Sequence, residues 1–404
     1  MNPWRVPYPK FGAGPGLERV SNIAAELGLA LSAFGESGCV IVGSNGKGST
    51  AAMTASLLAQ TGAGIGLFTS PHLFDLNERF RIDGEDIGDD ALRFHWRRVA
   101  DAAARAGEGE NLGGFEFLFL IAADWFAARG CAYTVWEAGI GGGLDPVRLI
   151  KAKRLALTSL DLEHTALLGE TLEEIACDKL DAAPSGATVF VGESCLGQRD
   201  AIEAHCAQRG VRCLFAPADQ VTLPLPGQFQ LQNAALALKL AEDIAPLSAA
   251  QKSAGLAQTQ WPGRLEIIEQ DPLVVIDVGH TPAAVRAACE GFETMRGERA
   301  ALLVCGVSHD KPAEAILEAL APGFATVVCA AARHKGASPA AIGAEVRRVN
   351  PKAEVVLAES VEEARHIALA RARGGAVYVA GSLFLAAEFK ALHLGRDPAT
   401  LVFF

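Results

Sequence analysis

The chain lacks several features that would direct it out of the cytoplasm. None of its nine cysteines forms a Cys-x-x-Cys pair, so free thiols in a reducing compartment are favoured over a disulfide or metal framework. No apolar run approaches the roughly 20 residues of a membrane span. Residues 1–5 lack the charged-then-apolar pattern of a signal peptide. The sequence therefore predicts a cytoplasmic protein that makes no use of a membrane.

Charge and size narrow the class of protein further. The net charge is −11 and basic residues form no tail or stripe, which argues against nucleic acid as a partner. Half of the residues are apolar and 21% are charged, a balance typical of soluble globular proteins. With 404 residues the chain is too long for one ordinary core, so two domains are expected.

Short β-branched and apolar runs alternate with Ala-, Leu- and Glu-rich segments in the first half of the chain. This alternation is typical of parallel strands joined by crossover helices, and it predicts an α/β sheet. The expected strands are 38–42, 65–69, 131–137, 154–159 and 187–192. The expected helices are 16–33, 50–61, 90–106, 115–129 and 171–182.

The pattern changes where residues 223–227 form a proline-rich loop before a helical run at 231–243. A polar stretch at 247–260 follows, and we place the domain boundary at its end. The prediction is a P-loop ATPase domain with a parallel sheet at 1–260 and a smaller, Rossmann-like α/β domain at 261–404. In the second domain the expected strands are 273–277, 301–305, 325–330, 354–357 and 376–380.

A glycine-rich turn joins the first expected strand to the helix that follows it. Residues 43–50 read Gly-Ser-Asn-Gly-Lys-Gly-Ser-Thr. Glycines let backbone N–H groups converge on phosphate oxygens, and a helix N-terminus adds partial positive charge. Lys47 supplies a cation, and the hydroxyl of Ser49 can bind Mg²⁺ on a nucleotide. Ile41 replaces the first glycine of the general P-loop pattern, but the flanking strand and helix still predict a nucleotide site.

The segment after the expected strand 65–69 combines turn-forming residues with cationic ones. Residues 69–84 include His72, Arg79 and Arg81. Parallel strands present their C-terminal ends at the sheet edge where α/β proteins bind ligands. The segment fits a substrate-binding loop, and a solvated connection is the alternative.

Glu137 ends the expected strand 131–137 and is followed by three successive glycines at 141–143. A lone carboxylate at the end of an apolar strand is costly unless it is paired or binds a metal. The glycines allow a ligand to approach the backbone closely. We therefore interpret Glu137 as a Mg²⁺ ligand, with a buried ion pair as the alternative.

Two further candidates follow the expected strand 154–159. His164 lies beyond a polar cluster at the end of that strand. A single histidine is usually structural, but Glu137 and Ser49 reach the same sheet edge, which favours a ligand role. Lys179 lies on an expected helix, where an isolated lysine is normally solvated.

The domain junction carries its own polar group. Residues 261–264 read Trp-Pro-Gly-Arg, and Asp277 and His280 close the first strand of the second domain. Arg264 suits phosphate recognition, because its planar guanidinium donates two hydrogen bonds at once. Together these side chains could reach across a cleft towards a nucleotide held by the first domain.

In their order along the chain, these segments resemble those of the folylpolyglutamate synthase/dihydrofolate synthase family of Mur-type amide ligases. The glycine-rich turn is similar to the family's Gly-Thr-Asn-Gly-Lys-Gly-Ser. Residues 69–73, Thr-Ser-Pro-His-Leu, and 77–79, Asn-Glu-Arg, are similar to its substrate loop. Similar runs also occur at 223–227, 261–265, 310–311 and 381–383.

The resemblance implies roles for individual residues. It implies that ATP is bound by Asn45, Gly46, Lys47, Gly48, Ser49, Thr50, Asn233 (near the adenine) and Arg264. It implies two Mg²⁺ ions bound by Ser49, Glu137, His164 and Lys179 in carbamylated form, and it allows a monovalent cation. It places Ser70, Pro71, His72, Arg79, Phe115 and Asp145 at the acceptor acid. It assigns the catalysis to Lys47, Glu137, His164, Lys179, Asp277 and His280.

Several positions depart from the family pattern. Gly143 stands where the family has arginine, and residues 146–148, Pro-Val-Arg, replace Ala-Thr-Asn. Asp181 follows Lys179 where the family has glycine. Thr281 replaces an asparagine, and Glu163 replaces an aspartate. These changes affect the expected acceptor pocket more than the groups for ATP and Mg²⁺.

The leading hypothesis is a monomeric ATP-dependent ligase that couples L-glutamate to a folate-type carboxylate through an acyl phosphate. A ligase of the same fold that acts on a different carboxylic acid is the first alternative. The second is a relative that binds nucleotide without catalysis. The metal- and phosphate-binding groups that are retained argue against that second alternative: Lys47, Ser49, Glu137, His164, Lys179, Arg264 and Asp277.

Overall fold

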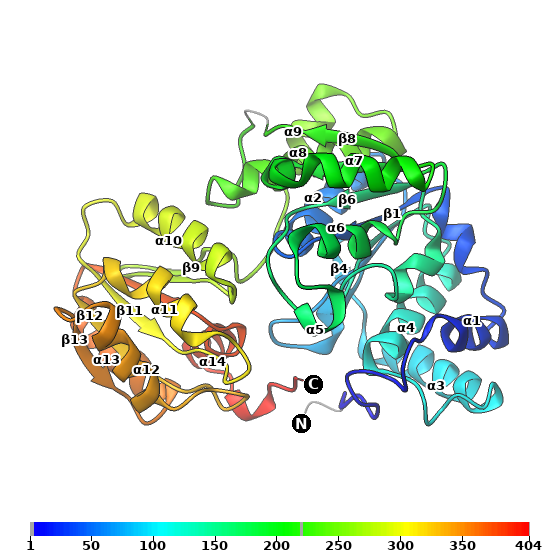
Figure 1. Cartoon of the computed structure of the whole chain (residues 1–404). Helices are drawn as coiled ribbons and strands as arrows, with labels where there is room; N and C mark the ends of the chain where they lie inside the picture. Colours follow the sequence, from blue (N-terminus) through cyan, green and yellow to red (C-terminus); the bar gives the residue numbers. More distant parts are fainter. Residues whose placement is uncertain (1–3, 219–220, 404) are drawn as a thin grey trace.

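The computed structural model describes residues 4–218 and 221–403, which form two lobes, each built on one β-sheet (Figure 1). We call the lobe with the eight-stranded sheet the N lobe and the lobe with the six-stranded sheet the C lobe. Within the described residues, no helix is both long and apolar enough to cross a membrane. All nine cysteines are free, as their scattered positions predict.

The N-lobe sheet has the strand order β4-β3-β2-β5-β1-β6-β7-β8. Its strands are β1 Gly38–Val42, β2 Ile65–Phe68, β3 Phe80–Ile82, β4 Glu85–Asp86, β5 Tyr133–Glu137, β6 Arg154–Leu157, β7 Thr188–Gly192 and β8 Arg212–Ala216. The strands from β2 to β8 in this order run parallel, and β3 and β4 add an antiparallel edge.

Helices cover both faces of this sheet because its central strand is buried on both sides. In β1, Val40 and Val42 face one apolar cluster, while Cys39 and Ile41 face the other. The first cluster packs under α1 Leu17–Glu26, α3 Asp89–Arg105, α4 Gly114–Ala128, α6 Leu172–Leu180 and α7 Arg199–Gln208. The second packs under α2 Lys47–Ala59, α8 Phe229–Ile244 and α9 Ala249–Ala257. A short α5, Thr165–Leu168, lies on the side facing the C lobe (Figure 1).

The C lobe repeats this three-layer arrangement with the strand order β13-β12-β11-β14-β10-β9. Its strands are β9 Glu266–Gln270, β10 Leu273–Ile276, β11 Ala301–Cys305, β12 Thr326–Cys329, β13 Glu354–Leu357 and β14 Ala376–Ala380. One face is covered by α10 Pro282–Arg296, α11 Ala313–Leu320 and α12 Pro339–Val349, and the other by α13 Val361–Ala372 and α14 Leu383–His393.

The expected α/β class and its two sheets are confirmed, with local differences. The expected helix 16–33 ends early, because Gly28 (φ +74°) takes the left-handed conformation that terminates α1. The stretch 247–260, expected as a polar linker, contains α9. Neither sheet is wholly parallel, since β3, β4 and β9 pair antiparallel with their neighbours. The strand β8 was not expected.

Candidate active site

The glycine-rich turn at residues 43–46 forms a cradle at the start of α2. Gly46 has φ +85°, and a Cβ there would lie 2.3 Å from Oδ1 of Asn233, so only glycine fits. Helix α2 begins at Lys47, which aims the free N–H groups of its first turn at the mouth of the cradle. The Lys47 ammonium donates hydrogen bonds to the carbonyl oxygens of Gly43 (2.8 Å) and Ser44 (3.2 Å).

The end of β6 braces this cradle from the neighbouring strand. Thr158 Oγ1 donates to the carbonyl oxygen of Asn45 at 2.6 Å, and Ser159 Oγ accepts from the Asn45 amide at 2.8 Å. From the C lobe, Thr281 Oγ1 donates to Oδ1 of Asn45 at 3.2 Å. Side chains of both lobes thus hold this glycine-rich turn, residues 43–46, which we call the phosphate loop after its expected role.

Asn233 on α8 also contacts the loop. Its Oδ1 accepts a hydrogen bond of 3.4 Å from Thr50 Oγ1, and its amide nitrogen donates to Gln230 at 2.9 Å. Asn233 is buried. Its position beside Gly46 and Thr50 places it against the phosphate loop, and its expected contact with an adenine stays a prediction.

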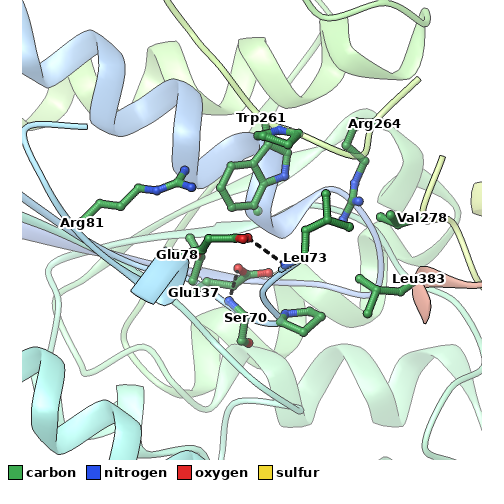
Figure 2. Close-up of a pocket in the computed structure, with 13 residues that line it drawn as sticks. Ser70, Leu73, Glu78, Arg81, Glu137, Trp261, Arg264, Val278 and Leu383 are labelled. Carbon is green, nitrogen blue, oxygen red and sulfur yellow. Dashed lines mark hydrogen bonds between the residues drawn. The ribbon is translucent and has the colours of Figure 1, made fainter. Parts of the chain in front are cut away.

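Glu137 lies beside the phosphate loop because β5 pairs with β1. The register places Glu137 opposite Ile41, two residues before the loop begins. Its Oε2 accepts a hydrogen bond of 2.9 Å from the Ser70 amide, as Figure 2 shows. Burial raises the pKa of Glu137, and the cations Lys47, Arg264 and Arg79 oppose that rise.

The chemistry of this site fits a magnesium ion. The Ser49 hydroxyl and the Glu137 carboxylate are hard oxygen ligands, and they come from adjacent elements, α2 and β5. The described residues contain no group of three or more His, Cys, Asp or Glu side chains able to hold a metal. An ion here therefore needs further oxygens from water or phosphate, which Mg²⁺ normally retains.

The other two expected metal ligands lie in different surroundings. Lys179 is buried, and its ammonium forms an ion pair of 3.0 Å with Glu163. Burial and Lys47 lower the pKa of Lys179, while Glu163 opposes the change. His164 is exposed at the start of α5 with φ +48°. Metal binding by Lys179 and His164 stays a prediction.

A narrow pocket opens between the lobes beside Glu137 (Figure 2). It encloses about 40 Å³, room for a few water molecules. The guanidinium of Arg81 lies over the Trp261 ring, 5.5 Å from its centroid. The lining comprises Gly48, Thr69, Ser70, Pro71, Leu73, Glu78, Arg81, Glu137, Trp261, Pro262, Arg264, Val278 and Leu383.

The pocket contains residues that sequence reasoning did not assign to the site. Trp261 contacts the start of α2, since a Cβ on Gly48 would lie 2.6 Å from its ring. Glu78 caps the backbone of its own loop, accepting from the amides of Leu73 (2.7 Å) and Phe74 (2.8 Å). Trp261 and Glu78 belong to the quoted family runs, which was a usable signal.

Three expected residues meet at the lobe junction. Arg264 lines the pocket, and burial lowers the pKa of its guanidinium against the opposing effect of Asp277. Asp277 accepts from the amides of Leu265 (3.1 Å) and Gly279 (2.7 Å), so it holds the backbone of this junction. Burial lowers the pKa of His280 to about 4, with Lys311 adding to the effect.

Four residues expected at the acceptor acid do not line this pocket. His72 is buried between Arg79 Nε (2.9 Å) and the carbonyl oxygen of Val402 (2.8 Å), so both of its ring nitrogens and the Arg79 Nε are engaged. Asp145 accepts from the amides of Gly139, Ile140 and Val147, which fixes the glycine-rich turn after β5. Phe115 packs against Gly139, where a Cβ would lie 2.9 Å from its ring.

Comparisons with known proteins agree with this architecture. Residues 263–383 match the family model described as "Mur ligase, glutamate ligase domain". A probable bifunctional folylpolyglutamate synthase/dihydropteroate synthase of Haloferax volcanii is 34% identical over 94% of this chain and 48% of its own length. The folylpolyglutamate synthase of Mycobacterium tuberculosis, solved with ADP and AMPPCP, has a TM-score of 0.87 at 26% identity, covering 95% of this chain and 96% of its own. Over nearly its whole length the chain is similar to members of the folylpolyglutamate synthase/dihydrofolate synthase family.

A second solved structure similar to this chain contains bound ligands. A bifunctional folylpolyglutamate synthase/dihydrofolate synthase solved with Mn, AMPPNP and L-glutamate has a TM-score of 0.84 at 26% identity, with 94% of each chain covered. The solved members match over nearly their whole length, whereas the chain spans about half the length of the curated relatives it matches. The family resemblance inferred from the motifs is confirmed.

Proposed function

We propose that this protein is an ATP-dependent ligase that joins L-glutamate to a folate-type carboxylate and releases ADP and phosphate. The observation that carries the proposal is the register of β1 and β5, which sets Glu137 beside the phosphate loop and its Lys47 and Ser49. The relatives solved with ADP, AMPPCP, AMPPNP, Mn and L-glutamate support it.

The chain supplies groups suited to each step. Lys47 and the N–H groups at the start of α2 bind and orient the terminal phosphates of ATP. Arg264 contributes charge from the opposite side of the pocket. The acid attacks the γ-phosphate to give an acyl phosphate and ADP, and the glutamate amine then displaces phosphate to form the amide. Ser49 and Glu137 would hold a Mg²⁺ ion, which would supply positive charge to neutralise the phosphates.

Closure of the lobes protects the reactive intermediate. Trp261, Leu73 and Leu383 bring apolar surface from both lobes to the pocket. Apolar walls exclude water, which would otherwise hydrolyse the acyl phosphate. We further propose that the domains divide at residue 260, before β9 begins at Glu266, and that the enzyme is a cytoplasmic monomer. We also propose that the enzyme binds two Mg²⁺ ions, one of them through carbamylated Lys179, and that it binds a monovalent cation.

One observation favours a different acid as the acceptor. Arg148 Nη1 donates a hydrogen bond of 2.7 Å to the carbonyl oxygen of Gly143, so an arginine lies over the turn in which the family's own arginine is replaced. The turn therefore has an arginine at position 148, whereas the family pattern has its arginine at the position of Gly143. A ligase with an altered acceptor pocket is therefore the second candidate.

The test is ADP release from Mg²⁺-ATP and L-glutamate, with dihydropteroate or tetrahydrofolate as the acid, and mass analysis of the product. We expect acid-dependent ADP and a product heavier by one glutamyl unit. Glu137→Gln should lower kcat by at least about 100-fold, while Glu203→Gln, on exposed α7, should leave it unchanged. Intact ATP binding without turnover on either acid would overturn the folate assignment.

A further inference from the structure

The loop after β2, residues 70–79, connects the reaction centre to the C lobe. Its first residue, Ser70, donates its amide hydrogen to Glu137. Its interior is held by Glu78, whose carboxylate accepts from the amides of Leu73, Phe74 and Asp75 at 2.7–2.9 Å. These three hydrogen bonds make the loop a stiff unit, and we expect a displacement of its tip to shift Ser70.

The tip of this loop is buried in the C lobe. Leu73 and Phe74 belong to the C-lobe apolar cluster under α13 and α14. Two cations of the C lobe cover the Phe74 ring, Lys390 at 5.1 Å and Arg396 at 4.9 Å from its centroid. Arg396 also forms an ion pair of 2.9 Å with Asp75.

The chain's last described segment, residues 396–403, contacts the same loop, and Figure 1 shows this red segment ending between the two lobes. His72 Nε2 donates to the carbonyl oxygen of Val402 at 2.8 Å, since its Nδ1 accepts from Arg79. The Phe403 ring stacks on His72 with 5.5 Å between centroids and 10° between planes. Phe403 also packs on His334 and Phe384, which anchors it to the C lobe.

We propose that residues 396–403 act as a clasp that couples closure of the two lobes to the placement of Ser70 on Glu137, with His72 and Phe403 as positioning residues. The clasp joins C-lobe side chains to the stiff loop, and that loop ends at the reaction centre. The inference rests on the proposed ligase function.

A purely structural role is disfavoured by the geometry of the pocket. The space beside Glu137 is about 40 Å³, so an acid that enters it requires the lobes to move apart. The clasp contacts must then break and re-form. A contact that forms only in the closed state stabilises that state, so it raises the fraction of enzyme molecules in which the lobes are closed and Ser70 lies on Glu137.

The variant that tests the clasp is Phe403→Ala, which removes the stack and keeps the Val402 carbonyl. Phe403→Tyr should restore the wild-type behaviour, because it keeps the ring. Leu394→Ala is the matched control, since Leu394 is 56% exposed just after α14. Loss of the stabilisation from one aromatic stack should change the equilibrium constant between open and closed lobes by roughly two- to tenfold.

Two measurements separate the clasp from the proposed ligase function. Hydrogen exchange of peptides spanning 72–79 should accelerate roughly two- to tenfold in Phe403→Ala, with exchange in α2 unchanged. In the ligase assay kcat should fall by a similar factor, while AMPPNP affinity measured by calorimetry stays the same. Unchanged exchange in 72–79 overturns the clasp whatever the assay shows. Absence of turnover on any folate-type acid in the wild type overturns the proposed function, whereas faster exchange with an unchanged kcat makes the contact purely structural and overturns the clasp.

Discussion

Thr281 of the C lobe donates a 3.2 Å hydrogen bond to the side-chain oxygen of Asn45 in the phosphate loop. Thr281 also caps α10, accepting from the Ala284 amide at 3.3 Å. The start of a C-lobe helix is therefore attached to the nucleotide cradle of the N lobe. Thr281 therefore joins the two lobes at the position where the family pattern given above has asparagine.

Thr281→Val should weaken that contact without changing the side-chain volume much. A neutral hydrogen bond contributes about 1 kcal/mol, so the KM for ATP should rise roughly fivefold. The helix cap is lost in the same variant, and thermal unfolding must be followed alongside the kinetics. Thr294→Val, on the exposed side of α10, is the control and should change neither quantity. An unchanged KM for ATP would show that the contact has no role in nucleotide binding.

Gly48→Ala should displace the Trp261 ring. The added Cβ would lie 2.6 Å from a carbon of that ring, which is bulky and part-buried at the lobe junction. We expect ATP turnover to fall at least about tenfold. Trp261→Phe in the same chain should recover part of the loss, since the smaller ring leaves room for the methyl group. Gly64→Ala, where nothing lies within 4 Å, is the control. A double variant no better than Gly48→Ala would contradict the steric explanation.

His72 should make the protein less stable as the pH falls. Burial lowers the pKa of His72 to about 3 from 6.5, and Arg79 adds to the effect. Between these values the unfolded chain binds a proton that the folded chain excludes. The free energy of unfolding should therefore fall by about 1.4 kcal/mol for each pH unit below 6.5.

Urea unfolding between pH 6.5 and pH 5 measures this slope. His72→Gln keeps a hydrogen-bonding side chain that does not titrate, so its stability should depend less on pH. His366→Gln, at an exposed position in α13, should keep the wild-type slope. Equal slopes in all three proteins would mean that His72 takes up its proton in the folded state.

Lys179 should gain a carbamate when carbon dioxide is present. Its burial lowers the pKa of the amine, and carbamylation requires the neutral form, so the modified fraction should rise with pH. Native mass spectrometry with and without bicarbonate measures the fraction directly. Lys179→Gln should abolish the modification, whereas Lys239→Gln, at an exposed position, should retain it. An unmodified Lys179 in active enzyme would leave its ion pair with Glu163 as its role.

The proximity of the expected nucleotide-binding groups was predictable because strand ends meet at one sheet edge. That rule correctly placed Glu137 beside the phosphate loop, because Glu137 pairs with Ile41, two residues before the loop, in the register of β1 and β5. A glycine-rich turn with a lysine, next to a buried carboxylate, suits few functions other than phosphate and metal binding. Helix α9 was missed although Ser248 and Gln251 form the capping box that announces a helix start.

The acceptor side was not predictable, because the partners that decide each role are distant or belong to the backbone. His72 has the residue type of a ligand-binding side chain, but its partner Val402 lies 330 residues away. In the sequence Asp145 looks like a carboxylate available to a ligand. In the structure it accepts hydrogen bonds from three backbone amides of its own turn. A sequence pattern records which groups are present, and only packing shows which of them remain available.

Leu73 and Phe74 are encoded in the N lobe and packed in the C lobe. Recombination between related ligases at the lobe junction would separate this pair of side chains from the surface that evolved to receive it. Chimaeras joined near residue 260 should therefore express well only when residues 70–79 come from the same parent as the C lobe. For exchange between homologues, the functional unit is discontinuous in the gene, and the boundary seen in the fold is a poor guide to where parents can be joined.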